Sequence, residues 1–250
     1  MKQASELTGR FSKRSYMLHY LMISFLLFSS AILLHLEGQT PLISNNQDLF
    51  TFIQSDLDYL NNKMEKYSRI EGSPYLDEDF VSGSVLHQRK KYVNLDLRYN
   101  HYEGYFEFSI EDGFKYIDPR RTRLDTVWMG ELTFVFVNYR HGNSIRQAFM
   151  ELANQGDTKL FLLNQVTLTE AEPAKGYAEA RPAKFQKRPE YIYLEVPGQP
   201  AIQFKGKNSV KEVFPDNANL LLAHVKKEKL KLKNLEDIAE LCRYYDSLQQ

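Results

Sequence analysis

Alternation of apolar and polar residues across positions 93–110 is the feature that most restricts the fold of this 250-residue chain. The alternating apolar residues are Val93, Leu95, Leu97, Tyr99, Phe106, Phe108 and Ile110. A period of two is typical of a β-strand with one buried face. Gly104 lies in the short polar stretch between the two runs, as a hairpin loop requires. We therefore expect an antiparallel hairpin with its turn at residues 101–104.

Further strand patterns extend this prediction along the chain. Strands are expected within residues 126–140, 145–153, 158–170, 191–196 and 201–204. Between Leu132 and Tyr139 both faces of the expected strand are apolar, which is typical of a central strand covered on both sides. The stretch SGS at residues 82–84 is interpreted as a turn that precedes a strand. Many short strands with regular turn signals predict an antiparallel β-sandwich or a partly closed barrel.

Helical patterns lie on both sides of the strand-rich region. In residues 46–67 six apolar residues are three or four positions apart: Phe50, Ile53, Leu57, Leu60, Met64 and Tyr67. This spacing places them on one narrow stripe of a helix, which either lies on its own domain or docks on a partner chain. Near the C-terminus we expect one helix from Asp216 or Asn217 and a last helix capped by Asn234 with Asp237. The predicted fold class is β-rich α+β, with an N-terminal amphipathic helix and two C-terminal helices.

The first residues have the pattern of an export signal. Lys13 and Arg14 precede an uncharged apolar run at residues 21–34. A basic flank before a short apolar run is typical of a secretory signal peptide, whereas a transmembrane helix needs about 20 apolar residues. We expect a signal peptide over residues 1–38, and the alternative is a retained segment that would be the only membrane contact. Either interpretation places the remaining chain in the periplasm or at the envelope.

The remaining chain divides into three parts by pattern. These are an N-terminal helix at residues 39–71, an antiparallel β-domain at residues 72–205 and a helical segment at residues 206–250. Within the β-domain, residues 169–190 contain three prolines, which disfavour a regular helix or a central strand. We expect an extended segment there. It is either mobile or packed across the sheet through Tyr177 and Phe185.

Charge and motif content exclude several classes of function. Residues 1–38 contain four basic and two acidic residues of the 32 of each in the chain, so 28 basic and 30 acidic residues follow them. Nucleic-acid binding calls for an excess of basic residues, which this part of the chain lacks. We therefore expect no nucleic-acid partner. Cys242 is the only cysteine, so no intramolecular disulfide can form, and we interpret it as a core residue. The sequence has no nucleotide-binding, zinc-protease or serine-hydrolase motif. We therefore expect no metal, no cofactor and no catalytic residue.

Tyrosines and carboxylates concentrate around the predicted hairpin. Tyr99, Tyr102 and Tyr105 lie in it or beside it. Aromatic residues there serve cross-strand packing, which we prefer, whereas an exposed row of rings would offer a surface for stacking on sugars. The three carboxylates at residues 77–79 are adjacent, unlike the alternating ligands of a calcium loop. We interpret them as a solvated acidic turn.

Four stretches carry a resemblance to a protein family. They are GSPYLDEDFVSGSV at 72–85, LRYNHYEGYFEF at 97–108, PAKGYAEARPAKFQ at 173–186 and VKKEKLKLKNLEDIAELCRYYDSL at 225–248. In combination they resemble uncharacterised secreted proteins of Bacteroidota-type bacteria, over about residues 72–248. The resemblance implies a signal peptide and an envelope location, and it supplies no catalytic residues.

Two functions remain as expectations. The first is a non-enzymatic binding or assembly factor that docks on another envelope or outer-membrane protein through its N-terminal helix. The alternative is a β-domain that binds a small apolar molecule or a glycan in a cleft. A closed core with an exposed apolar stripe would favour docking, and a cavity lined by aromatic side chains would favour a ligand.

Overall fold

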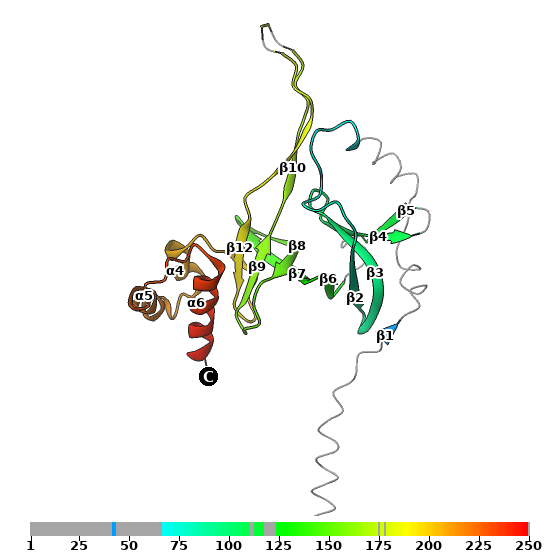
Figure 1. Ribbon diagram of the computed structural model, residues 1–250. Helices are drawn as coiled ribbons and strands as arrows, with labels where there is room; N and C mark the ends of the chain where they lie inside the picture. The colour runs from blue at the N-terminus through cyan, green and yellow to red at the C-terminus, as the bar shows by residue number, and fades with distance from the viewer. Residues whose placement is uncertain are drawn as a thin grey trace, which may run out of the picture. The chain divides into compact units, whose positions relative to one another are not determined.

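The computed structural model describes residues 42–43, 67–110, 113–117, 124–174, 176–177 and 179–249 (Figure 1). The strands of the main sheet are β1 (Leu42–Ile43), β2 (Val81–His87), β3 (Lys90–Asn100), β4 (Tyr105–Ile110), β5 (Gly113–Ile117), β6 (Thr126–Met129), β7 (Leu132–His141), β8 (Ser144–Leu152), β9 (Lys159–Leu163), β12 (Tyr191–Glu195) and β13 (Ile202–Gln203). A second sheet consists of β10 (Val166–Thr169) and β11 (Lys184–Lys187). The helical elements are η1 (Lys207–Ser209), α4 (Val210–Val213), α5 (Ala218–Lys227) and α6 (Leu235–Ser247). No helix in these ranges is long and apolar enough to span a membrane.

The main sheet has the order β13-β12-β9-β8-β7-β6-β2-β3-β4-β5, and β1 pairs with β3. Neighbours in this order are antiparallel, while β1 runs parallel to β3. The sheet is not closed, but Ala201 beside β13 reaches β7. Its carbonyl accepts the Arg140 N–H and its own N–H donates to the Asn138 carbonyl, both at 2.8 Å. The sheet is open and antiparallel, and the C-terminal part of the chain forms helices. This arrangement confirms the predicted fold class. The expected helix at 46–67 lies outside the described residues, apart from Tyr67, as does the expected signal peptide.

The predicted hairpin at residues 93–110 is present as β3 and β4. Asn100 pairs with Tyr105 at its end. The Asn100 side-chain oxygen accepts the backbone N–H groups of Tyr102 at 3.2 Å and Glu103 at 3.0 Å, which fixes the turn. Gly104 has φ of 75°, a conformation that glycine adopts without steric cost. Local sequence therefore determines this hairpin.

The structure adds detail to one local prediction and contradicts another. Residues 126–140 contain two strands, β6 and β7, because the chain reverses at Gly130, whose φ is 58°, and Met129 pairs with Leu132. A two-residue reversal of this kind favours glycine. Residues 82–84 lie inside β2 and are not a turn. The register between β2 and β3 shifts between Gly83 and Val85, so the glycine marks a bulge in a strand.

Buried side chains cover both faces of the sheet around β7. One cluster joins β2, β3, β4, β6, β7 and β8 through residues such as Tyr92, Leu97, Phe106, Phe108, Phe134 and Phe149. On the opposite face of β7, Val137 and Tyr139 belong to a different cluster. The prediction that this strand is covered on both sides is therefore confirmed, although Leu132 at its start is 40% exposed.

The C-terminal helices share a core with the sheet. Leu160 and Leu194 from β9 and β12 pack with Leu221 of α5 and Leu241 of α6. Figure 1 shows the three helices grouped beside this end of the sheet. As predicted, α5 follows Asn217, and α6 begins at the Asn234 cap, whose side chain accepts the Asp237 N–H at 2.8 Å. The short α4 was not predicted. Cys242 is fully buried on α6, and burial raises the pKa of its thiol to about 12, which agrees with a core residue.

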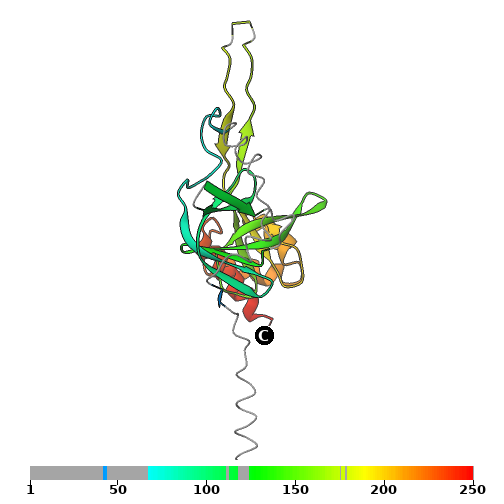
Figure 2. The ribbon, with the colours of Figure 1, turned by 90° about the vertical axis from the view of Figure 1, so that its right-hand side faces the viewer.

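Residues 169–190 belong to a two-stranded ribbon that continues β10 and β11. Four residue pairs join the strands, from Val166 with Lys187 to Thr169 with Lys184, and a further bridge joins Glu172 and Arg181. Figure 2 shows the two strands side by side. Phe185 is buried at the base of the ribbon, whereas Tyr177 is fully exposed. Phe185 therefore packs with Tyr67 and Val166, and the alternative that the segment lies across the sheet through both Tyr177 and Phe185 is wrong.

Candidate functional site

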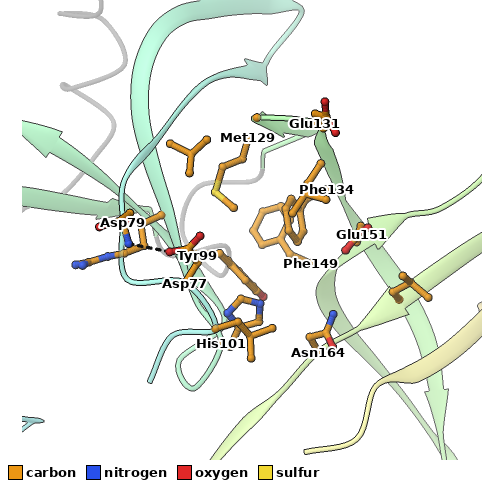
Figure 3. A pocket seen from close by; sticks show the side chains of 16 residues that line it. Asp77, Asp79, Tyr99, His101, Met129, Glu131, Phe134, Phe149, Glu151 and Asn164 are labelled. Atoms are coloured by element: carbon orange, nitrogen blue, oxygen red, sulfur yellow. Dashed lines mark hydrogen bonds between the residues drawn. The ribbon is translucent and has the colours of Figure 1, made fainter. Parts of the chain in front are cut away.

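A cavity of about 280 Å³ lies between the segment before β2, the end of β3, and the β6, β7 and β8 strands (Figure 3). Its volume is close to the lower end of the range for small-molecule sites, about 300–1,000 Å³. The apolar part of its wall comprises Leu76, Val81, Tyr99, Met129, Leu132, Phe134, Phe149 and Leu162. The polar part comprises Asp77, Asp79, Arg98, His101, Glu131, Glu151 and Asn164.

Three aromatic rings form the floor of the cavity. Tyr99, Phe134 and Phe149 come from β3, β7 and β8, and each is at most 5% exposed. The Tyr99 ring centre is 5.4 Å from that of Phe134 and 6.4 Å from that of Phe149. The three rings also belong to the main buried cluster, so their positions are fixed by packing on the side away from the cavity. The floor is therefore a preformed aromatic surface.

One wall is the acidic segment at residues 76–79, which Arg98 holds on the sheet. The Arg98 guanidinium donates to the Glu78 carbonyl at 2.8 Å and lies over the Tyr75 ring, with its carbon 4.0 Å from the ring centre. Tyr75 in turn donates its hydroxyl hydrogen to Glu107 at 2.9 Å. Burial, with the Glu107 charge as a second cause, raises the pKa of Tyr75, so its hydroxyl keeps the proton that it donates. Arg98 thus fixes the segment before β2 at two points, the Tyr75 side chain and the Glu78 carbonyl.

Arg98 is itself neutralised by a buried carboxylate. Its guanidinium contacts Glu107 at 2.6 Å, and the two side chains are 12% and 1% exposed. Asn100 donates a further hydrogen bond to Glu107 at 3.3 Å. Although Arg98 lines the cavity, its positive charge is therefore committed to an internal pair.

Four other carboxylates surround the cavity. Asp77 and Asp79 are exposed on the segment before β2, Glu131 is exposed in the turn between β6 and β7, and Glu151 is partly buried on β8. In the view of Figure 3, Asp77 and Asp79 lie on one side of the Phe149 ring and Glu151 on the other. Burial, with nearby Glu190 as a second cause, raises the pKa of Glu151.

His101 completes the polar part of the wall as an uncharged group. Its ring packs edge-on against Tyr99 with 4.7 Å between centres, and its Nδ1 is buried and has no hydrogen-bond partner among the described residues. Burial lowers the pKa of His101 to about 4. Because that value is well below neutrality, the imidazole is neutral at pH 7.

The predicted site residues lie in different places. Tyr99 is in the cavity floor, but Tyr105 is buried against Tyr116, with ring centres 4.9 Å apart. Tyr102 packs on Phe185 with centres 5.2 Å apart. The alternative of an exposed aromatic row is therefore wrong for Tyr99 and Tyr105, because both rings are needed in the core, and cross-strand packing is the correct interpretation.

The stripe expected on the N-terminal helix is described only at Tyr67. That side chain is 9% exposed, packs edge-on against Phe185 at 5.2 Å and donates its hydroxyl hydrogen to Glu103 at 2.9 Å. It is thus buried within its own domain and not available to a partner. The other five residues of the stripe, Phe50, Ile53, Leu57, Leu60 and Met64, lie outside the described residues.

Several cavity residues carried no signal in the sequence. The acidic turn was predicted as solvated, and its carboxylates are indeed exposed, but their place beside an aromatic floor was not predicted. Glu131 and Glu151 were not identified either, because only the pairing of β6 with β2 and of β8 with β7 brings them near residues 77–79.

The carboxylates are spread around the cavity and do not converge on one point. Among the residues that the structure describes, no three histidine, cysteine, aspartate or glutamate side chains are grouped closely enough to hold a metal ion. Comparison with protein-family models, with curated proteins and with solved structures gives no match to this chain. The resemblance to secreted Bacteroidota-type proteins therefore remains an interpretation of the sequence.

Proposed function

We propose that the β-domain is a non-enzymatic binding module that takes a small molecule into the cavity between β3, β7 and β8. The observation that carries the proposal is the 280 Å³ cavity with a floor of three buried aromatic rings. Protein interiors leave few voids larger than a water molecule. A hollow of this size against a packed aromatic surface is a concave, largely apolar site of the kind that binds small ligands.

The fixed walls of the cavity support binding by a preformed site. The floor is held by the main cluster, and the acidic wall is held by Arg98 through the Glu78 carbonyl and the Tyr75 ring. Binding of a ligand would therefore not lose conformational entropy in these side chains, which improves its affinity.

The polar groups of the cavity favour binding over catalysis. A catalytic base is usually oriented by a hydrogen bond from a further side chain, whereas no side chain of the described residues makes a hydrogen bond to the buried Nδ1 of His101. Export from the cytoplasm and docking of the N-terminal helix on an envelope protein rest on the sequence pattern alone and stay predictions.

Filling the mouth of the cavity tests the proposal. Leu132 lines the cavity and is 40% exposed, so Leu132→Trp places a larger ring in the hollow without opening the core. We expect wild-type protein to bind the neutral probe benzyl alcohol, measured by saturation-transfer NMR and titration calorimetry. Leu132→Trp should weaken this binding at least about tenfold, because the probe and the new ring compete for one volume.

Ile145→Trp is the matched control, because Ile145 is 56% exposed on β8 and does not line the cavity. It should bind benzyl alcohol as the wild type does, and thermal unfolding should show both variants folded. Equal binding by all three proteins, or no binding by the wild type, would contradict the proposal.

A further inference from the structure

We propose that the ligand of this cavity is an organic cation, an amine or quaternary ammonium group joined to an apolar body. The inference rests on the proposed binding function and adds the charge of the ligand. It is carried by four carboxylates that have no cationic partner among the described residues and that surround a floor of aromatic rings.

The four carboxylates come from three separate parts of the chain. Asp77 and Asp79 belong to the segment before β2, Glu131 to the β6–β7 turn and Glu151 to β8. In the described part of the chain, no lysine, arginine or histidine forms an ion pair with any of them. Their negative charge is therefore available to a ligand.

The basic residues near the cavity offset this charge only in part. Arg98 contacts Glu107 at 2.6 Å and donates to the Glu78 carbonyl, so its charge is already paired. His101 has a pKa of about 4 and adds no charge at pH 7. The Lys187 ammonium donates to the Leu76 carbonyl at 3.4 Å and adds one positive charge beside the cavity, against four carboxylates. Carboxylates around a low-dielectric hollow concentrate a negative potential there. The cavity therefore attracts cations and repels anions.

The aromatic floor selects an organic cation instead of a bare ion. Faces of tyrosine and phenylalanine rings attract ammonium groups within about 6 Å, and cages of such rings recognise quaternary ammonium ligands. Tyr99, Phe134 and Phe149 supply these rings. The carboxylates, in contrast, are too dispersed to surround one metal ion within the described residues. A ligand with an apolar body over the rings and a charged group near the rim uses both features.

Three probes of similar shape separate charge from apolar contact. We expect benzyltrimethylammonium to bind at least about tenfold more tightly than benzyl alcohol at low ionic strength, and benzoate not to bind, by calorimetry on the full chain. Raising the salt concentration should weaken binding of the cation and not that of benzyl alcohol, because salt screens the exposed charges. Glu131→Gln and Glu151→Gln should each weaken binding of the cation several-fold, and by a larger factor than they weaken binding of benzyl alcohol.

Glu170→Gln is the control, since Glu170 is exposed and does not line the cavity. It should not change the affinity of any probe. If benzyl alcohol binds as tightly as the cation, the charge inference is overturned and the binding function stands. Binding of none of the probes would overturn both. An equal loss for cation and alcohol in the glutamine variants would show that these residues only shape the cavity, which also overturns the charge inference.

Discussion

Replacing Arg98 by methionine is expected to lower the free energy of unfolding by about 3–5 kcal/mol. The substitution keeps most of the apolar length of the side chain but leaves the Glu107 carboxylate, which is 1% exposed, without its 2.6 Å partner. Removing one member of a buried pair is costly because the remaining charge stays desolvated. The variant also loses the hydrogen bond from Arg98 to the Glu78 carbonyl and hence one fixed point of the cavity wall.

Urea unfolding followed by circular dichroism measures this effect. Arg140→Met is the matched control, because Arg140 contacts Glu212 at 3.4 Å with side chains 43% and 54% exposed. Exposed pairs contribute about 0–1 kcal/mol, so the control should lose no more than that. Adding Glu107→Leu to Arg98→Met should recover part of the loss, since no buried charge then remains. A loss no larger than that of Arg140→Met would show that the Arg98–Glu107 pair is not buried in solution.

Replacing Gly83 by alanine is expected to lower the free energy of unfolding by about 3 kcal/mol, the upper part of the usual range for overpacking. A Cβ at this position would lie 2.2 Å from the Trp128 carbonyl oxygen and 2.8 Å from the Leu97 side chain. Relief requires β2 to move away from β6, because a carbonyl in a sheet cannot turn aside as a flexible side chain does. Gly83 pairs with Met129, which lines the cavity, so the shift reaches the site as well.

Gly142→Ala separates this clash from the general cost of losing glycine. Gly142 has φ of 59°, yet nothing lies within 4 Å of an added Cβ. Its replacement should cost only the strain of a left-handed conformation, about 1 kcal/mol. Chemical denaturation of the two variants in parallel gives the comparison. Equal losses of unfolding free energy in the two variants would contradict the close approach of β2 and β6 at Gly83.

Parts of the fold governed by neighbours in sequence could be predicted. The β3–β4 hairpin follows from its period of two and Gly104, and the start of α6 follows from Asn234 and Asp237. Gly83 was misinterpreted because a glycine between serines is typical of a turn. Its actual role, close approach to Trp128, depends on the pairing of β2 with β6, about 40 residues apart, which a local pattern does not report.

Local sequence patterns could not predict the cavity either. Tyr99 was identified as a candidate because it is one of three clustered tyrosines, but packing in the core decides which of them reaches a cavity. Glu151 has no distinguishing neighbours in the sequence. It becomes a candidate only because β8 pairs with β7 and brings it beside Phe134, its partner in register. The order of the strands in the sheet brings the residues of the site together, and the composition of the sequence does not reveal that order.

The most direct measurement of ligand binding at this cavity is an amide-resolved NMR titration of the full chain with benzyltrimethylammonium. We expect saturable shifts confined to amides around the cavity, such as those of Asp79, Met129, Leu132 and Glu151. We also expect Leu132→Trp to abolish these shifts and Ile145→Trp to keep them. Saturable shifts at another surface, or no saturable shifts in the wild-type protein, would contradict the claim that this cavity is the binding site.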